Sequence, residues 1–225
     1  MNIRNFLLSL LLTIICINLS TAQVTSLSVT ESPEYKDEVR SEDILAIHTT
    51  TSGITGIVRS SKKHLLFDLF DQELNKTYSE VLDVHKKERY VGDLFFGEEL
   101  KVFTVLAPKK KERILYCHTF NLKTRSHKKV ELFATTVEKN QNLFGGRNKR
   151  QTSFTISPDG HYFAIATDNI KKNLNSYTIR VYDANSLELY FKRSYMEHPE
   201  KYFVPNDITM DNAGAVYTIG KEYIK

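Results

Sequence analysis

Short runs in which apolar and polar residues alternate dominate the chain from residue 42 onward. Four of these runs begin at a glycine, at Gly53, Gly97, Gly160 and Gly214, and read GITGIVR, GEELKVFTVLA, GHYFAIAT and GAVYTIG. Alternation with a period of two places apolar side chains on one face of an extended strand, so each run predicts a β-strand. Another short apolar run precedes each glycine: ILAIH, VGDLFF, TSFTI and NDITM. The pattern therefore predicts four hairpins.

The stretch SPDG at residues 157–160 shows the turn chemistry that these hairpins need. Pro158 fixes φ at the second turn position, Asp159 tolerates the next conformation, and Gly160 supplies a positive φ without steric cost. We therefore expect Gly160 to adopt a positive φ between two antiparallel strands.

An aromatic residue followed by Asp or Asn ends a third strand after each of the first three hairpins. These corners are Phe70-Asp71, Phe120-Asn121 and Tyr182-Asp183. The Asp and Asn residues initiate turns. Counting back from the corners by twos gives one mostly apolar face per strand, so Leu69, Cys117 and Ile179 are predicted to be buried. A fourth strand follows each corner, in YSEVLDV, KVELFATT and LELYFKRSY.

Four strands that recur in one order are typical of a β-propeller blade. A sandwich of unrelated hairpins would give no reason for the same glycine and the same corner to return in order. We predict an all-β fold, a β-propeller with blades near residues 42–85, 88–137, 150–196 and 204–225. These are about three and a half blades, whereas closure takes at least four. We expect an N-terminal part of a larger propeller or a truncated one, with VTSLSVT at residues 24–30 as a candidate closing strand.

Two stretches also resemble a known group of proteins. FTISPDGHYFAIAT resembles the inner hairpin of WD-like propeller repeats in secreted and periplasmic bacterial proteins, and PNDITMDNAGAVYTIG resembles the repeat of bacterial secreted propellers. The resemblance covers residues 42–225 loosely and these two stretches well. The Trp-Asp pair and the structural His of true WD repeats are absent, since residue 182 is Tyr and the Gly-His pair at 160–161 lies in another strand. The resemblance implies the fold, which hosts many functions.

The first 22 residues have the composition of a secretory signal. They hold one Arg, an apolar run from Phe6 to Leu19, and small residues in STAQ, which predicts cleavage before Gln23. Because the apolar run is shorter than the roughly 20 residues that span a bilayer, we expect no transmembrane segment after cleavage. Residues 23–41 would form an extended N-terminal segment. The expected location is exported: periplasmic, outer-membrane-associated or extracellular.

Composition and motifs favour a binding module over an enzyme. The chain has 13 Phe and 12 Tyr but no Trp, which suits pleated sheets. Loss of Cys16 with the signal leaves Cys117, as a nucleophile or, preferably, as a small buried hydrophobe. The seven His are scattered, and no phosphate loop, paired-cysteine metal site, hydrolase motif or cofactor motif is present. The alternative is the propeller portion of a larger exported peptidase-like enzyme or sensor whose active part lies beyond Lys225.

Lysines cluster in the predicted loops between the second and third strands, in SSKKH, PKKKER and DNIKKNLN. In a propeller these loops share one end with the connections between blades, whereas the other turns carry Asp and Glu. The predicted binding face consists of Lys62, Lys63, Lys109, Lys110, Lys111, Arg113, Lys171 and Lys172. A basic face concentrates anionic partners, so we expect an anionic glycan or an acidic protein surface. Nucleic acid is not expected, because the chain is exported and no aromatic residues interleave the lysines.

Overall fold

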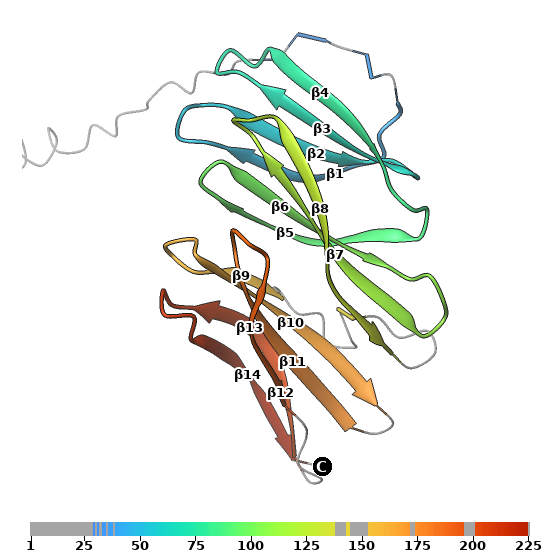
Figure 1. Cartoon of the computed structure of the whole chain (residues 1–225), viewed down its shortest axis with the longest axis vertical. Helices are drawn as coiled ribbons and strands as arrows, with labels where there is room; N and C mark the ends of the chain where they lie inside the picture. The colour runs from blue at the N-terminus through green and yellow to red at the C-terminus, as the bar shows by residue number, and fades with distance from the viewer. Residues whose placement is uncertain are drawn as a thin grey trace, which may run out of the picture. The chain divides into compact units, whose positions relative to one another are not determined.

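The computed structural model describes residues 39–137, 143–144, 153–171, 174–195 and 201–224, together with residues 29, 31, 33, 34, 36 and 37. The chain divides into two compact units, residues 1–31 and 32–225, and all described strands belong to the second. In these residues the regular structure is entirely β, in three four-stranded antiparallel sheets and one two-stranded sheet (Figure 1). The prediction of an all-β fold built from four-stranded blades is confirmed.

The sheets follow one another along the chain and are named blades 1 to 4, with strands a to d in chain order. Blade 1 contains β1 (Asp43–Thr49), β2 (Thr55–Ser60), β3 (His64–Phe70) and β4 (Lys76–Asp83). Blade 2 contains β5 (Glu88–Phe96), β6 (Glu99–Leu106), β7 (Glu112–Asn121) and β8 (Ser126–Thr136). Blade 3 contains β9 (Phe154–Ile156), β10 (Tyr162–Lys171), β11 (Leu174–Asp183) and β12 (Leu189–Tyr195). Blade 4 contains β13 (Lys201–Met210) and β14 (Val216–Ile224).

Neighbouring blades pack face to face through three apolar clusters. One face of blade 1 packs on blade 2, the far face of blade 2 packs on blade 3, and the far face of blade 3 packs on blade 4. The first strands of successive blades contact one another, β1 with β5, β5 with β9 and β9 with β13. The predicted core positions Leu69, Cys117 and Ile179 lie in these clusters and are 1%, 0% and 2% exposed. This succession of stacked sheets is a partial β-propeller.

The four turn glycines share one backbone conformation. Gly53, Gly97, Gly160 and Gly214 have φ values of 82°, 61°, 73° and 80°. Each lies in the turn between strands a and b, where a residue with a Cβ atom would be strained. The predicted positive φ of Gly160 is confirmed, and the repeat that the sequence pattern indicated is a repeat of backbone geometry.

We expect Gly160→Val to lower the free energy of unfolding by about 1–3 kcal/mol through backbone strain alone. A Cβ atom at this position would also lie 2.0 Å from the Phe96 ring, which must move. Gly97→Val is the matched control, because a Cβ atom there meets nothing within 4 Å. Urea denaturation should show the larger loss for Gly160→Val, and equal losses would mean that only the φ angle matters.

The candidate closing strand at residues 24–30 lies outside the described residues apart from Val29, which is exposed. The edge of β14 that faces away from β13 has no partner strand among the described residues. The closing role of residues 24–30 therefore stays a prediction.

Candidate functional site

Three loops that carry lysines lie next to one another beside blades 1 and 2. They are residues 61–63, 84–87 and 107–111, which connect β2 to β3, β4 to β5 and β6 to β7. The Val84 amide donates to the Lys63 carbonyl at 2.7 Å, and the Lys87 ammonium donates to the Pro108 carbonyl at 3.4 Å. The exposed lysines of these loops form what we name the basic loop cluster: Lys62, Lys63, Lys86, Lys87, Lys109, Lys110 and Lys111.

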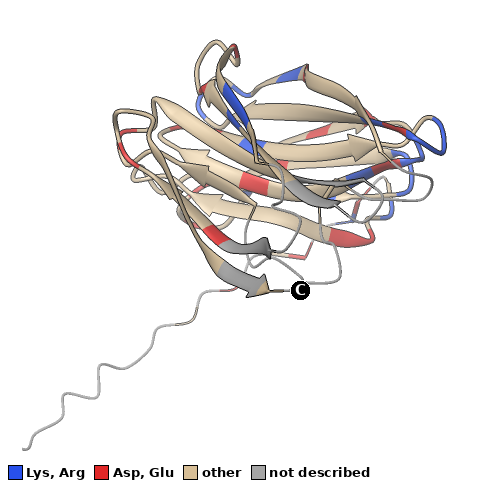
Figure 2. Ribbon diagram, turned by 90° about the horizontal axis from the view of Figure 1, so that it is seen from below, with Lys and Arg blue, Asp and Glu red and all other residues tan. Residues whose placement is uncertain are grey.

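The basic loop cluster is poorly neutralised. Lys109 pairs with Glu112 at 3.1 Å, and the two side chains are 76% and 41% exposed. Within the described part of the chain, no other lysine of the cluster has an ion pair. Figure 2 shows Lys and Arg gathered mostly at the loops on one side of the sheets and Asp and Glu prominent at the opposite turns. The cluster therefore presents a net positive charge to solvent.

Arg113 departs from the predicted binding face. The residue is only 7% exposed, although the sequence placed it among the exposed cations. Its Nη1 donates to the carbonyls of Lys109 at 3.2 Å and Glu112 at 2.7 Å, and more weakly to that of Lys110. A guanidinium group carries five donors in a fixed plane, which suits a cluster of carbonyls. Arg113 thus holds the loop at residues 107–111 in shape from beneath.

The third predicted lysine loop, around Lys171 and Lys172, is only partly described in the structure. Lys172 lies outside the described residues, and for Lys171 only the backbone at the end of β10 is described. Their place on the binding face stays a prediction.

A feature that sequence reasoning missed is a buried polar pair between strands b and c in each of blades 1 to 3. The pairs are Arg59 Nε to Asp68 Oδ2 at 2.9 Å, Thr104 Oγ1 to His118 Nε2 at 3.2 Å, and Arg180 Nη1 to Thr167 Oγ1 at 3.0 Å. All six residues are at most 8% exposed. The strand c member always lies two residues before the corner aromatic, which is the signal that could have revealed the pairs.

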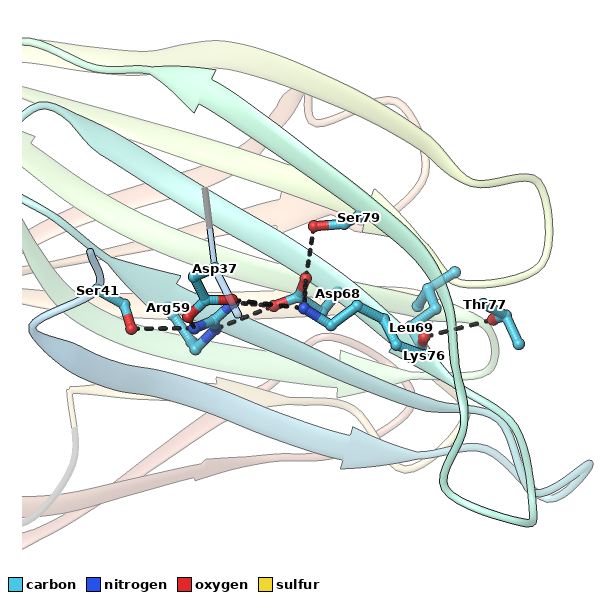
Figure 3. Close-up of polar contacts among 8 residues, drawn as sticks. All are labelled: Asp37, Ser41, Arg59, Asp68, Leu69, Lys76, Thr77 and Ser79. Atoms are coloured by element: carbon cyan, nitrogen blue, oxygen red, sulfur yellow. Dashed lines mark hydrogen bonds and ion pairs between the residues drawn. The ribbon is translucent and has the colours of Figure 1, made fainter. Parts of the chain in front are cut away.

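In blade 1 the pair belongs to a larger network of charges, drawn in Figure 3. The Asp68 carboxylate is 0% exposed and accepts hydrogen bonds from Arg59 and from Ser79 Oγ, the latter at 2.7 Å. The Lys76 ammonium lies 3.2 Å from its other side. One carboxylate therefore joins strands b, c and d of this blade.

The N-terminal segment completes this network from outside the blade. Asp37 accepts hydrogen bonds from both terminal nitrogens of Arg59, and Ser41 Oγ accepts one at 2.9 Å. The hydrogen bond from Arg59 holds the pKa of Asp37 below its ordinary value, although burial opposes the charge. Paired and hydrogen-bonded in this way, the buried charges are compensated. Asp37 and Ser41 thus fasten the segment to the outward face of blade 1.

Blade 2 buries a chain of titratable groups. Glu88 Oε1 lies 2.9 Å from His118 Nε2, and Glu88 Oε2 accepts from Lys129 Nζ at 2.9 Å. His118 Nδ1 lies 3.1 Å from Nε2 of the half-buried His127. Burial opposes the charge of Glu88, but hydrogen bonds from His118, Thr104 and Lys129 outweigh it and lower its pKa to about 2. Burial, with the nearby charges of His118 and Lys129, lowers the pKa of His127 to about 4.

These networks have the character of structural contacts. Among the described residues, no group of three or more His, Cys, Asp or Glu side chains is arranged to hold a metal ion. Cys117 is fully buried, and burial raises the pKa of its thiol to about 11. The thiol is therefore protonated and inaccessible at neutral pH, which agrees with the interpretation of Cys117 as a buried hydrophobe.

A small cleft lies between the turns of blades 2 and 3. Its volume is about 150 Å³, and its polar lining includes Glu99, Asn121, Lys128 and Asn185. Small-molecule sites usually enclose about 300–1,000 Å³, so this cleft is too small for a ligand of ordinary size. The basic loop cluster remains the stronger candidate site.

Comparison with known proteins concerns the backbone fold alone. No protein-family model matches the chain, and no curated protein matches it in sequence. The Dos1 propeller matches with a TM-score of 0.44 and 10% identity, over 78% of this chain and 42% of that one. The propeller domain of the Trilobed protease from Pyrococcus furiosus matches at 0.41 and 11%, over 82% and 57%. The Nup133 propeller domain of Vanderwaltozyma polyspora matches at 0.42 and 7%, over 83% and 55%.

The chain spans about half the length of these solved propellers. Among the described residues, no helix has the length and the apolar composition to cross a membrane.

Proposed function

We propose that the protein is an exported, non-enzymatic interaction module that binds an anionic partner through the basic loop cluster. The observation that carries the proposal is the contact of three separate loops, through Val84 with Lys63 and through Lys87 with Pro108. These contacts gather seven exposed lysines that the sequence distributes over 50 positions. The N-terminal apolar run supports export, and the described residues offer no reactive thiol and no metal cluster.

The favoured partner is an extended anionic polysaccharide. Lysine ammonium groups are flexible point charges, which suit a chain of repeated anionic groups better than one planar carboxylate. The cluster spreads over adjacent loops of two blades, so it can follow an extended polymer. Exposed charges are screened by salt beyond about 10 Å at 0.1 M, and we expect the binding to weaken steeply as salt rises.

A charge-reversal variant tests this function. Replacing Lys62, Lys63, Lys110 and Lys111 with Glu should weaken binding to immobilised heparin at low ionic strength by about 10-fold or more, because the local field is inverted. The set leaves three lysines of the cluster unchanged: Lys86, Lys87 and Lys109. The ammonium groups of Lys87 and Lys109 make hydrogen bonds that shape the loops.

The matched control carries the same charge change at four other exposed lysines, Lys36, Lys123, Lys128 and Lys192. It should elute from heparin near the salt concentration of the wild type. Equal elution of all three proteins would mean that the lysines only keep the module soluble. Retention on immobilised polyglutamate but not on heparin would replace the polysaccharide with an acidic protein surface.

A further inference from the structure

One position of strand b differs sharply between blade 4 and the other blades. Val58, Phe103 and Ala166 face the next blade and are each 0% exposed, whereas the corresponding Ile219 is 72% exposed. The correspondence is fixed by pairing, because Val58, Phe103 and Ile219 each lie opposite the residue that follows a β-bulge in strand a. Ala166 pairs with Ile179 as Phe103 pairs with Cys117.

Tyr217 extends this exposed face of blade 4 and is 57% exposed. Its counterpart in blade 3, Ala164, is 0% exposed. Two large apolar side chains therefore occupy positions that the fold elsewhere covers with another blade. Contiguous exposed apolar residues of this kind mark interaction surfaces.

Strand a of blade 1 shows the complementary difference. Ile47 pairs with Ile57 in strand b, as Phe154 pairs with Ile165 and Ile208 pairs with Thr218. Phe154 and Ile208 pack against the preceding blade and are 8% and 6% exposed, whereas Ile47 is 57% exposed. Ile44 lies on the same strand and is 62% exposed.

The contact between blades 2 and 3 shows how these two faces fit together. Phe103 of strand b stacks on Phe154 of the next strand a, with ring centroids 4.7 Å apart. Ile219 corresponds to Phe103, and Ile47 corresponds to Phe154. The two exposed isoleucines therefore occupy the positions that form the two sides of the contact between blades 2 and 3.

We propose that two copies of this chain associate head to tail, with blade 4 of each copy packed on blade 1 of the other. Each copy presents both faces, and the head-to-tail contact closes a ring of two copies when it relates the copies by a half-turn. The ring would contain twice the four described sheets of one copy, which falls within the roughly 4–8 blades of known propellers.

The N-terminal segment covers only one end of the corresponding face of blade 1. Asp37 and Ser41 bind Arg59 of strand b, which pairs with Ile44 of strand a. Ile47 lies three residues further along strand a and is left exposed. Strands from a second copy would cover this part of the face.

Sedimentation equilibrium of the full chain tests the proposal, and the expected mass is twice that of one chain. Ile219→Asp and Ile47→Asp should each halve the mass, because each places a charge in the contact from one side. Leu189→Asp is the matched control, since Leu189 is 51% exposed on β12, away from both faces. This variant should stay dimeric. Circular dichroism should show the wild-type sheet content for all three variants.

Cross-linking distinguishes head-to-tail contact from a symmetric contact between two blades 4. Chains in which Cys16 is replaced with Ser and which carry either Ile47→Cys or Ile219→Cys should cross-link with a short bismaleimide only when the two are co-expressed, because the remaining Cys117 is buried. Cross-linking of Ile219→Cys alone would overturn the head-to-tail arrangement. A wild-type monomer at every concentration would overturn the dimer, and a mass that keeps growing with concentration would overturn the closed ring.

Discussion

Replacing Asp68 with Ala is expected to lower the free energy of unfolding by about 3–5 kcal/mol, as the loss of one partner from a buried ion pair does. The Asp68 carboxylate is 0% exposed, and it accepts from Arg59, which is itself 8% exposed. Without it, the Arg59 guanidinium keeps only Asp37 and Ser41, which belong to the N-terminal segment. A small domain is stable by about 5–15 kcal/mol, so the loss takes up much of the total.

Urea denaturation at pH 7 measures this loss, and Asp83→Ala is the control. Asp83 Oδ1 also lies 3.2 Å from a basic side chain, at His64 Nε2, but the Asp83 side chain is 96% exposed. An exposed pair contributes about 0–1 kcal/mol, so the control should stay close to the wild type. A loss below about 1 kcal/mol for Asp68→Ala would show that water enters the site and solvates Arg59.

The repeat of the fold could be predicted because it is recorded in local chemistry. Gly160 and Gly214 are needed where φ is positive, and this requirement comes from the backbone of the turn itself. The signal at the corners is equally local. Directly after Tyr182, Asp183 accepts hydrogen bonds from the amides of Asn185 and Ser186, which form the turn. Each signal lies within a few residues of the structure that it specifies.

The position of the polar pairs recurs in the sequence, but their burial could not be predicted from it, because burial depends on what covers each face. A period of two shows that Asp68 faces away from Phe67 and Leu69, but it does not show whether water or protein lies there. In the structure Asp68 and His118 are buried between blades or beneath the N-terminal segment.

For one loop cation the error was the opposite: the sequence predicted exposure, and the structure shows burial. Arg113 stands in the run PKKKER, where its neighbours are exposed, yet it is buried under the loop that the run forms. The sequence pattern alone predicts the same exposure for every cation of such a run. The structure separates cations that bind carbonyls or carboxylates from those that remain available to a partner.

Acid should destabilise the protein between pH 7 and 5, and His127 should account for about 1–2 kcal/mol of the loss, toward the lower end because its half-buried ring is partly screened. Burial and the neighbouring cations lower the pKa of His127 from about 6.5 to about 4. Between pH 6.5 and 4, His127 is protonated in the unfolded chain and neutral in the folded chain. The free energy of unfolding therefore falls as pH falls from 6.5 toward 4. Glu88, with a pKa of about 2, adds a further loss that begins below pH 4.5.

His127→Gln separates this effect from general acid denaturation, because an amide can still bond His118 but does not titrate. Urea denaturation at pH 7 and pH 5 should show a smaller difference for the variant than for the wild type. His161→Gln is the control with the opposite sign, because a hydrogen bond with Asp159 raises the pKa of His161, and its contribution is lost as pH rises. That variant should keep the full acid loss. If His127→Gln lost as much stability at pH 5 as the wild type, the acid loss would have to come from groups other than His127.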